Sequence, residues 1–286
     1  MTIVDMRLRP PLASWTDKPQ FRKGAEFYPS RIGFPRPPSA EQRSMPLLLE
    51  EMDKAGITLG VVMGRQSAEP HGVIPNDDIA AVIADYPDRF VSFAGIDISR
   101  ETDWCLAEID RCLALPGFKG VSLEPGASPT PMMADDERLY PIYERCVGRD
   151  VPISITLSGL LSHMAGVPYE YGSPMPLYTA AKDFPTLDFV ISHGAWPWVR
   201  ELLGICFVLP NIYVSPDLYM VGVNLPGADE YVKAANMYMG DRMLFGTAYP
   251  SRPLIESVQA FDEWTFAEGV KAKVLGLNAL RVMRMA

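Results

Sequence analysis

The stretch TLGVVM, at residues 58–63, begins a pattern in which short apolar runs alternate with amphipathic segments. The runs FVSFAGI (90–96) and KGVSL (119–123) follow it along the chain. Short runs of this kind, rich in valine and phenylalanine, are typical of strands buried on both faces. The amphipathic segment Met45–Ala55 is followed by Gly56, which is suited to the position just past a helix end. The pattern therefore indicates alternating strands and helices.

The same alternation extends over the whole chain. Eight runs predict strands: Thr2–Met6, Thr58–Met63, Phe90–Ile96, Lys119–Leu123, Pro152–Leu157, Asp188–Ser192, Asn211–Ser215 and Met243–Thr247. Repeated strand–helix units imply parallel strands joined by right-handed crossovers. A doubly wound open sheet would also alternate, but no GxGxxG loop follows the first run. We therefore predict an α/β fold, a (β/α)8 TIM barrel, with residues 1–286 forming one domain.

Two connections are much longer than the others. They are the proline-rich stretch Pro10–Pro38 after the first strand and the stretch Gly159–Pro176 after the fifth. Loops that follow barrel strands emerge at the face where active sites lie. Loops of this length are usually lids or binding elements, although they can also pack along the outside of a barrel.

Composition excludes several classes of function. The net charge of −9 argues against binding to nucleic acid, which needs a basic face. No run is long enough for a signal peptide or a membrane span. The cysteines form no CxxC pair and are interpreted as buried thiols of a cytoplasmic protein: Cys105, Cys112, Cys146 and Cys206.

Polar residues stand where the predicted strands end. They are Arg7, Arg9, Arg65, Asp97, Glu124, Thr156, His193, Asp217 and Tyr249, with Arg252 just beyond the last strand. In a barrel, side chains at the carboxyl ends of the strands converge on one pocket. We expect a single site built from these residues.

Four segments in order resemble motifs of the amidohydrolase-related family, in the branch that includes aminocarboxymuconate semialdehyde decarboxylase, resorcylate decarboxylases and dicarboxylate lactonases. They are VDMRLRPP (4–11), VISHGAW (190–196), LFGTAYP (244–250) and NALRVMR (278–284). The likeness covers nearly the whole chain and implies a TIM barrel. In the family, the first segment contains Asp-x-His-x-His and the third contains an aspartate, and these residues bind metal.

Most positions that the resemblance assigns to metal ligands are changed in this chain. The two first-strand histidines are Arg7 and Arg9, Thr156 stands at the fifth-strand position, and Ala248 replaces the last-strand aspartate. Only His193 is retained. Guanidinium stays protonated and has no lone pair to offer, and a catalytic zinc takes three protein ligands. We expect no metal and no cofactor.

The two arginines have two possible roles. Glu124 and Asp217 could neutralise Arg7 and Arg9 in a structural network of salt bridges. Alternatively, a substrate carboxylate or phosphate could complete the pairing through bidentate contacts. A relocated metal site built from Glu124, Asp217 and His193 is a further alternative, opposed by the nearby cations. Two more arginines could strengthen a preference for anions: Arg65 and Arg252.

His193 is the best candidate for proton transfer, because histidine titrates near neutral pH. The arginine pair would lower its pKa and keep it neutral, as a general base requires. It could instead serve only for hydrogen bonding below the turn Trp196–Trp198. Tyr249 and Thr156 could donate hydrogen bonds to an oxyanion, although packing also explains them. The other two histidines are interpreted as exposed loop residues: His71 and His163.

These observations favour a metal-independent, lactonase-like hydrolase that acts on a small carboxylated substrate. The catalytic residues would be His193, Glu124 and Asp217. One alternative is a metal-dependent hydrolase or a non-oxidative decarboxylase with relocated ligands. Another is a catalytically silent barrel that only binds anions. A homodimer is possible, because Tyr213–Val223 and Tyr231–Met239 have apolar character that we expect to be exposed.

Overall fold

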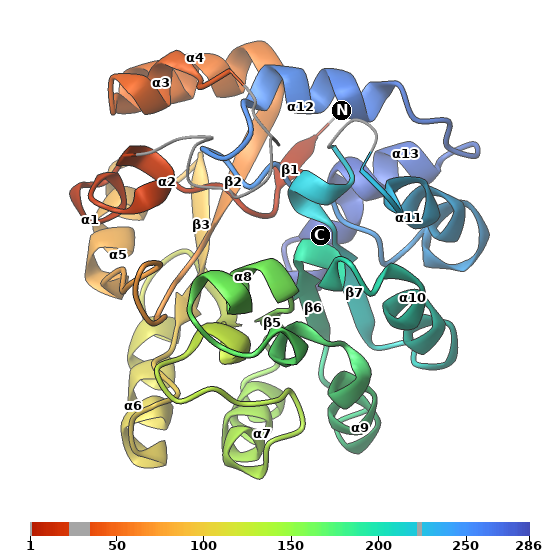
Figure 1. Cartoon of the computed structure of the whole chain (residues 1–286). Coiled ribbons are helices and arrows are strands. Elements are labelled where there is room, and N and C mark those ends of the chain that lie inside the picture. Colours follow the sequence, from red (N-terminus) through yellow and green to blue (C-terminus); the bar gives the residue numbers. More distant parts are fainter. Residues whose placement is uncertain (1, 23–34, 222–224) are drawn as a thin grey trace.

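Seven parallel strands form one sheet in a computed structural model that describes residues 2–22, 35–221 and 225–286. Neighbours in the sequence are neighbours in the sheet (Figure 1). The strands are β1 (Ile3–Asp5), β2 (Ile57–Met63), β3 (Phe90–Gly95), β4 (Phe118–Leu123), β5 (Ile153–Thr156), β6 (Phe189–Ser192) and β7 (Ile212–Ser215). Each lies within about two residues of a predicted run, so seven of the eight predicted strands are confirmed.

The eighth predicted strand, Met243–Thr247, is not a regular strand. Its first residue nevertheless forms a parallel bridge with Val214 of β7. Further along, the Met6 amide donates to the Phe245 carbonyl, and Leu8 forms a parallel bridge with Tyr249. The segment thus contacts the residues at both edges of the sheet, which makes the architecture an α/β barrel.

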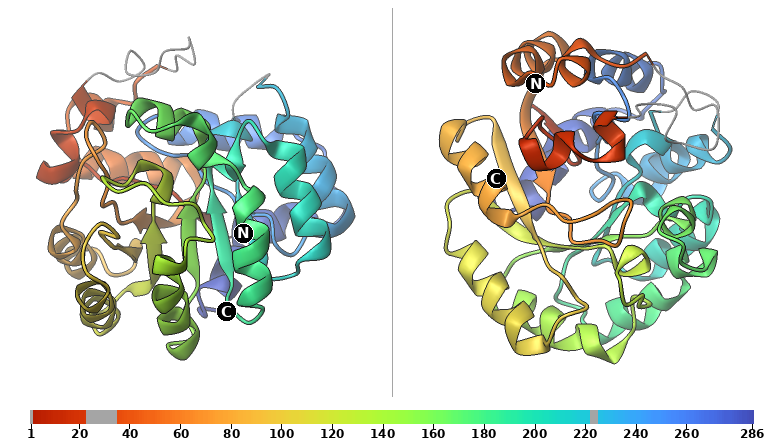
Figure 2. Two further views of the ribbon diagram at one scale, coloured as in Figure 1. Left: turned by 60° about the horizontal axis from the view of Figure 1, so that its bottom comes forward. Right: turned by 60° about the vertical axis from the view of Figure 1, so that its left-hand side comes forward.

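Most of the helices lie outside the strands (Figures 1 and 2). They are α1 (Ala13–Thr16), α2 (Pro19–Arg22), α3 (Pro38–Glu41), α4 (Met45–Ala55), α5 (Asn76–Asp85), α6 (Thr102–Leu113), α7 (Tyr140–Gly148), α8 (Gly159–Met164), α9 (Met175–Asp183), α10 (Val199–Val208), α11 (Ala228–Ala234), α12 (Leu254–Asp262), α13 (Val270–Ala272) and α14 (Asn278–Val282). Helix α4 has the bounds expected from the sequence, and Gly56 after it has the left-handed φ of 72° that a helix end favours.

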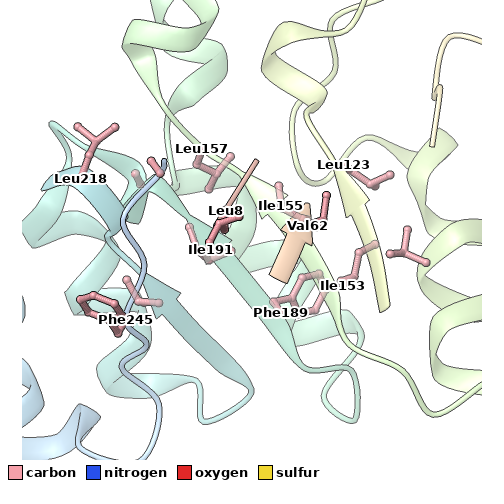
Figure 3. Close-up of a cluster of buried hydrophobic side chains, with 14 of the residues drawn as sticks. Leu8, Val62, Leu123, Ile153, Ile155, Leu157, Phe189, Ile191, Leu218 and Phe245 are labelled. Carbon is pink, nitrogen blue, oxygen red and sulfur yellow. The ribbon is translucent and has the colours of Figure 1, made fainter. Parts of the chain in front are cut away.

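Buried apolar side chains fill the space between strands and helices. Strands β3, β5, β6 and β7 are buried along their whole length, as the apolar runs predict. Figure 3 shows side chains from β2, β4, β5 and β6 gathered in one cluster, among them Val62, Leu123, Ile155 and Ile191. Such a packed interior holds the strand ends in fixed positions.

The connection after β5 contains more regular structure than the sequence suggested. Helix α8 occupies its first part, and a 3₁₀ turn at Tyr169–Gly172 follows. In the left view of Figure 2 the strand arrows point towards the end where α8 lies. Of the other predicted loop, Pro10–Pro38, the described parts form α1 and α2 and the start of α3, and residues 23–34 lie outside the described residues.

The burial of the cysteines and the exposure of two apolar segments were also predicted from the sequence. All four cysteines are buried and unpaired. No helix in the described part of the chain has the length and apolar character needed to cross a membrane. The expected exposure of Tyr213–Val223 and Tyr231–Met239 is wrong for most described residues, since Tyr213, Tyr231 and Met239 are buried and Met237 is the large apolar exception. Val223 lies outside the described residues.

Candidate active site

Arg7 lies at the centre of the polar residues that the strand ends bring together. Its Nη2 donates to Glu124 Oε1 over 2.8 Å, and its Nη1 donates to Thr156 Oγ1 over 3.3 Å. Its Nε lies 3.9 Å from Asp217 Oδ2. Arg7 therefore links residues at the ends of β4, β5 and β7, and its side chain is only 2% exposed.

Glu124 is shared by two arginines. Arg65, just past β2, donates from Nε to Oε2 over 2.9 Å and from Nη2 to Oε1 over 3.1 Å. The Ser67 hydroxyl also donates to Oε2. Burial opposes ionisation of this carboxyl, but Arg65 and Arg7 outweigh it and hold its pKa well below the usual range. We call Arg7, Arg65, Ser67, Glu124 and Thr156 the charge cluster.

Asp217 and His193 form a second buried pair. The His193 Nδ1 lies 3.2 Å from Asp217 Oδ2, close enough for contact although the geometry falls short of a hydrogen bond. The backbone N–H of His193 donates to the same oxygen over 3.1 Å, and the Ser215 hydroxyl donates to Oδ1. Burial raises the pKa of Asp217, but His193 and Arg7 outweigh it, so the pKa is lowered. The carboxylate therefore stays ionised.

His193 is held in its neutral form. Burial is the largest cause and Arg7 the second, and together they lower its pKa to about 4. A lowered pKa was predicted from the sequence, but the predicted cause was the arginine pair and not burial.

The backbone turns sharply at these positions. His193, Asp217 and Ala248 have left-handed φ values of 65°, 52° and 59°. Residues with side chains rarely adopt this region, and such positions concentrate at functional sites. A side chain at Gly246 would lie 2.5 Å from Asp217 Oδ1, so this glycine leaves room for the carboxylate.

Arg9 has different surroundings from Arg7. Its Nη1 donates to the carbonyl oxygens of Ala248 and Tyr249 over 3.1 and 3.3 Å. Its guanidinium carbon lies 5.7 Å from the ring centre of Trp15, and that of Arg65 lies 5.5 Å from the same ring. The buried Trp15 of α1 therefore contacts two guanidinium groups, a favourable cation–π arrangement.

A narrow pocket opens beside these residues. It encloses about 370 Å³ of unoccupied space, part of it open to solvent. Its lining is Arg9, Gln20, Arg65, His71, Ser158, Leu160, Leu161, Met164, His193, Leu218, Tyr219 and Ser251. Among the described residues this lining includes two arginines and no carboxylate, so the pocket is suited to an anion.

The burial of His71 differs from the prediction made from the sequence. This histidine was expected to be an exposed loop residue, but it is buried in the pocket wall. Its Nε2 lies 3.2 Å from the Leu161 carbonyl of α8, so the proton is on Nε2. Burial, and secondly Arg65, lower its pKa to about 3. His163, by contrast, is exposed as expected, although it lies in helix α8 and not in a loop.

Other predicted site residues lie away from the pocket lining. The Tyr249 hydroxyl is 2.7 Å from Ser39 Oγ, which also bonds to Glu51, so it is engaged on the side of α3 and α4. The Thr156 hydroxyl accepts from Arg7. Arg252 is buried but does not line the pocket, and Asp97 accepts hydrogen bonds from Ser99.

Further polar residues of the barrel mouth, the end at which the carboxyl ends of the strands lie, were not predicted; Asp5, Ser67 and Ser215 are among them. Asp5 accepts from the Arg7 and Thr247 amides, and burial raises its pKa to about 6. Its place in the Asp-x-Arg-x-Arg motif was an available signal. Ser67 and Ser215, by contrast, stand close to predicted site residues, but a serine near a strand end is too common to indicate a role.

The family model for amidohydrolases matches residues 4–285, nearly the whole chain. The chain belongs to the amidohydrolase family. This confirms the resemblance of its motifs and agrees with the α/β barrel seen in the structure.

Individual relatives of this amidohydrolase-family protein include enzymes. It is 33% identical over 211 residues to a 2-keto-4-carboxy-3-hexenedioate hydratase from Sphingobium, covering 64% of this chain and 61% of that protein. It is 24% identical to a 2-amino-3-carboxymuconate-6-semialdehyde decarboxylase from Dictyostelium discoideum, covering 73% of this chain and 65% of that one. The chain thus matches somewhat less than two thirds of the length of these curated relatives.

Solved structures give a similar result. An uncharacterized TIM-barrel protein from Bordetella bronchiseptica has a TM-score of 0.91 and 38% identity, with 100% of this chain and 99% of that chain covered. The 4-oxalomesaconate hydratase from Rhodopseudomonas palustris has a TM-score of 0.67 and 21% identity, with 99% and 96% covered, and shows the fold alone.

The residues in the mouth do not fit the divalent metal that the family motifs imply. Arg7 and Arg9 stand at two of the ligand positions, and Arg7 is engaged with Glu124. Among the described residues, no three His, Cys, Asp or Glu side chains are grouped so that they could hold a metal ion. Guanidinium offers no lone pair to a metal. The metal-ligand motifs of this family member are therefore degenerate.

Proposed function

We propose that this protein is a metal-independent hydrolase that opens a small carboxylated lactone, with His193 as general base. The observation that carries the proposal is the combination of a neutral histidine, backed by Asp217, with two arginines in the lining of one pocket. The arginines would bind the carboxylate and the histidine would activate water.

Substrate binding would depend on Arg65. Its Nε and Nη2 are fixed by Glu124, whereas its Nη1 is buried with no hydrogen-bond partner in the described part of the chain. A guanidinium that is held rigid and keeps its Nη1 group for a ligand is preorganised for a carboxylate. Arg9 lines the same pocket and adds positive charge.

Water activation would depend on His193. Because Nδ1 faces Asp217, the proton belongs on Nδ1, which leaves Nε2 on the opposite edge of the ring to accept a proton. A pKa of about 4 keeps Nε2 unprotonated at neutral pH but makes it a weak base. A bound carboxylate would raise that pKa, since it would offset the guanidinium charges that lower it.

The reaction would proceed in two steps. His193 Nε2 takes a proton from water while the water oxygen bonds to the lactone carbonyl carbon, which gives a tetrahedral oxyanion near the positive charge of Arg9. The ring C–O bond then breaks, and the imidazolium returns the proton to the departing alkoxide. The product is an open hydroxy acid, and the imidazole is restored.

Hydration of a carbon–carbon double bond is the second candidate, favoured by the similarity to a 2-keto-4-carboxy-3-hexenedioate hydratase. The same base would take a proton from water as the oxygen adds to the alkene. The guanidinium groups would stabilise the resulting enolate until the imidazolium returns the proton to its carbon, which restores the base.

Turnover by metal-stripped protein tests the proposal. Wild type, His193→Gln and His163→Gln would be assayed in a chelator against carboxylated lactones and carboxylated 2-oxoalkenoates. We expect the His193 change to lower kcat/KM by about 10²- to 10⁴-fold. The exposed His163 is the matched control and should have no effect.

Two results would contradict the proposal. One is turnover that requires added Mn²⁺ or Zn²⁺, and the other is full activity in the His193 variant. Turnover of alkenoates but not of lactones would favour the hydratase candidate.

A further inference from the structure

The guanidinium of Arg7 occupies a position that a metal ion could otherwise fill. It contacts Glu124 at 2.8 Å, Thr156 at 3.3 Å and Asp217 at 3.9 Å. These three side chains come from the ends of different strands. One cation thus sits among the oxygen atoms that converge on the barrel mouth.

Both carboxylates around Arg7 are completely buried and ionised. The side chain of Asp217 is 0% exposed and that of Glu124 is 2% exposed. Buried carboxylates need a compensating positive charge, which is supplied in proteins by a basic side chain or by a bound metal. Removing one partner of such a group leaves an uncompensated charge.

We propose that the Arg7 guanidinium is a fixed internal cation that takes the place of a divalent metal in this barrel. The arginine stands at the first ligand position of the Asp-x-His-x-His motif, so the change removes a ligand and supplies a charge at once. This role is independent of the proposed lactone hydrolysis. It also assigns Arg7 to organising the mouth, whereas Arg9 and Arg65 line the pocket.

The proposal predicts that truncating Arg7 creates a site for an exogenous cation. Arg7→Ala leaves Glu124, Asp217 and the nearby His193 around a vacated volume. We expect the Tm to fall by about 10 °C. Methylguanidinium at tens of millimolar, or Mn²⁺, should restore part of that loss, because each supplies positive charge and carboxylates suit Mn²⁺.

Two controls isolate the effect of charge. Urea at the same concentration has a similar shape but no charge and should not restore the Tm. Arg242→Ala is the matched variant, since the Arg242 guanidinium donates to backbone carbonyls of Leu209, Ile212 and Cys206. Its Tm should not respond to methylguanidinium or Mn²⁺.

A second variant keeps the proposal testable if Arg7→Ala does not fold. Arg7→His places an imidazole beside Asp217 and Glu124, and it should bind Mn²⁺ about tenfold or more tightly than wild type in calorimetric titration. The proposal is overturned if no cation stabilises either variant, or if wild type binds Mn²⁺ equally well. Neither readout involves turnover, so this result is separate from the test of His193.

Discussion

Arg7 and Arg9 are separated by one residue and both are buried, yet they end in different chemical surroundings. Arg7 pairs with Glu124 in the charge cluster and does not line the pocket. Arg9 lines the pocket, donates to backbone carbonyls and contacts the ring of Trp15. One residue type at neighbouring positions can therefore pair with buried carboxylates at one of them and line a pocket at the other.

Substitutions in the charge cluster should lower stability more than substitutions in the pocket lining. Glu124→Gln removes the carboxylate that Arg7 and Arg65 share, so both guanidinium groups lose a buried counter-charge. We expect the free energy of unfolding to fall by about 3 to 5 kcal/mol, measured by chemical denaturation. Glu50→Gln is the control, because Glu50 pairs with Lys54 at the surface and should cost about 1 kcal/mol or less. Equal losses of unfolding free energy in the two variants would show that the buried charge cluster stabilises the fold no more than a surface ion pair does.

His193 connects the two regions, and its protonation should be visible in stability. Its pKa is about 4 when folded and 6.5 ordinarily, so the unfolded chain binds more protons between these values. The free energy of unfolding should therefore fall as the pH drops from 6.5 towards 4, by about 3 kcal/mol from this residue.

Comparison of variants isolates that contribution. His71 acts in the same direction, since its pKa is lowered to about 3, whereas Asp5, raised to about 6, acts in the opposite one. The difference between wild-type and His193→Gln stability curves removes both. Identical slopes for the two proteins would show that His193 is not held neutral by the fold, and His163→Gln should match wild type.

In the pocket, Arg9→Gln should weaken the binding of carboxylates more than it lowers the stability of the fold. We expect carboxylate affinity to weaken about tenfold or more, because an ionic contact is lost. The loss of stability should be smaller than for Glu124→Gln, because the Arg9 guanidinium donates to the neutral carbonyl oxygens of Ala248 and Tyr249. Calorimetric titration with the best acid from a panel, paired with denaturation, measures both. An unchanged affinity would place the anion elsewhere.

The smallest effect is expected for Thr156→Val. The change keeps the shape of the side chain and removes one hydrogen bond from Arg7, 3.3 Å long. A cost of about 1 kcal/mol in unfolding free energy follows, with little change in ligand affinity. A large loss of affinity would instead support the expectation that Thr156 contacts the substrate.

The sequence predicted the strands closely because apolar runs report burial. It also predicted that Arg7, Glu124 and Asp217 lie close together, because parallel strand ends converge. It could not separate Arg7 from Arg9. Alternation along a strand would place both on one side, but β1 ends at Asp5 and the alternation does not extend past it. The position of the second arginine depends on tertiary contacts with Trp15 and Tyr249.

The residues beyond strand ends were harder to predict for the same reason. Tyr249 follows Ala248, whose left-handed φ turns the chain, and its hydroxyl bonds to Ser39. His71 lies in a turn with no periodicity, and its burial depends on Leu161 of α8, about ninety residues later. Local sequence carries no signal for such distant contacts.

One measurement tests the central claim, that arginines have changed this mouth from a metal site into an anion site. Metal-stripped wild type and Arg9→Gln would be titrated with small mono- and dicarboxylates at constant ionic strength, with the Tm followed in each case. We expect at least one acid to raise the Tm of stripped wild type, added Zn²⁺ not to enhance the effect, and Arg9→Gln to lose it. Stabilisation by acids only after metal is restored would show that the mouth still depends on a metal.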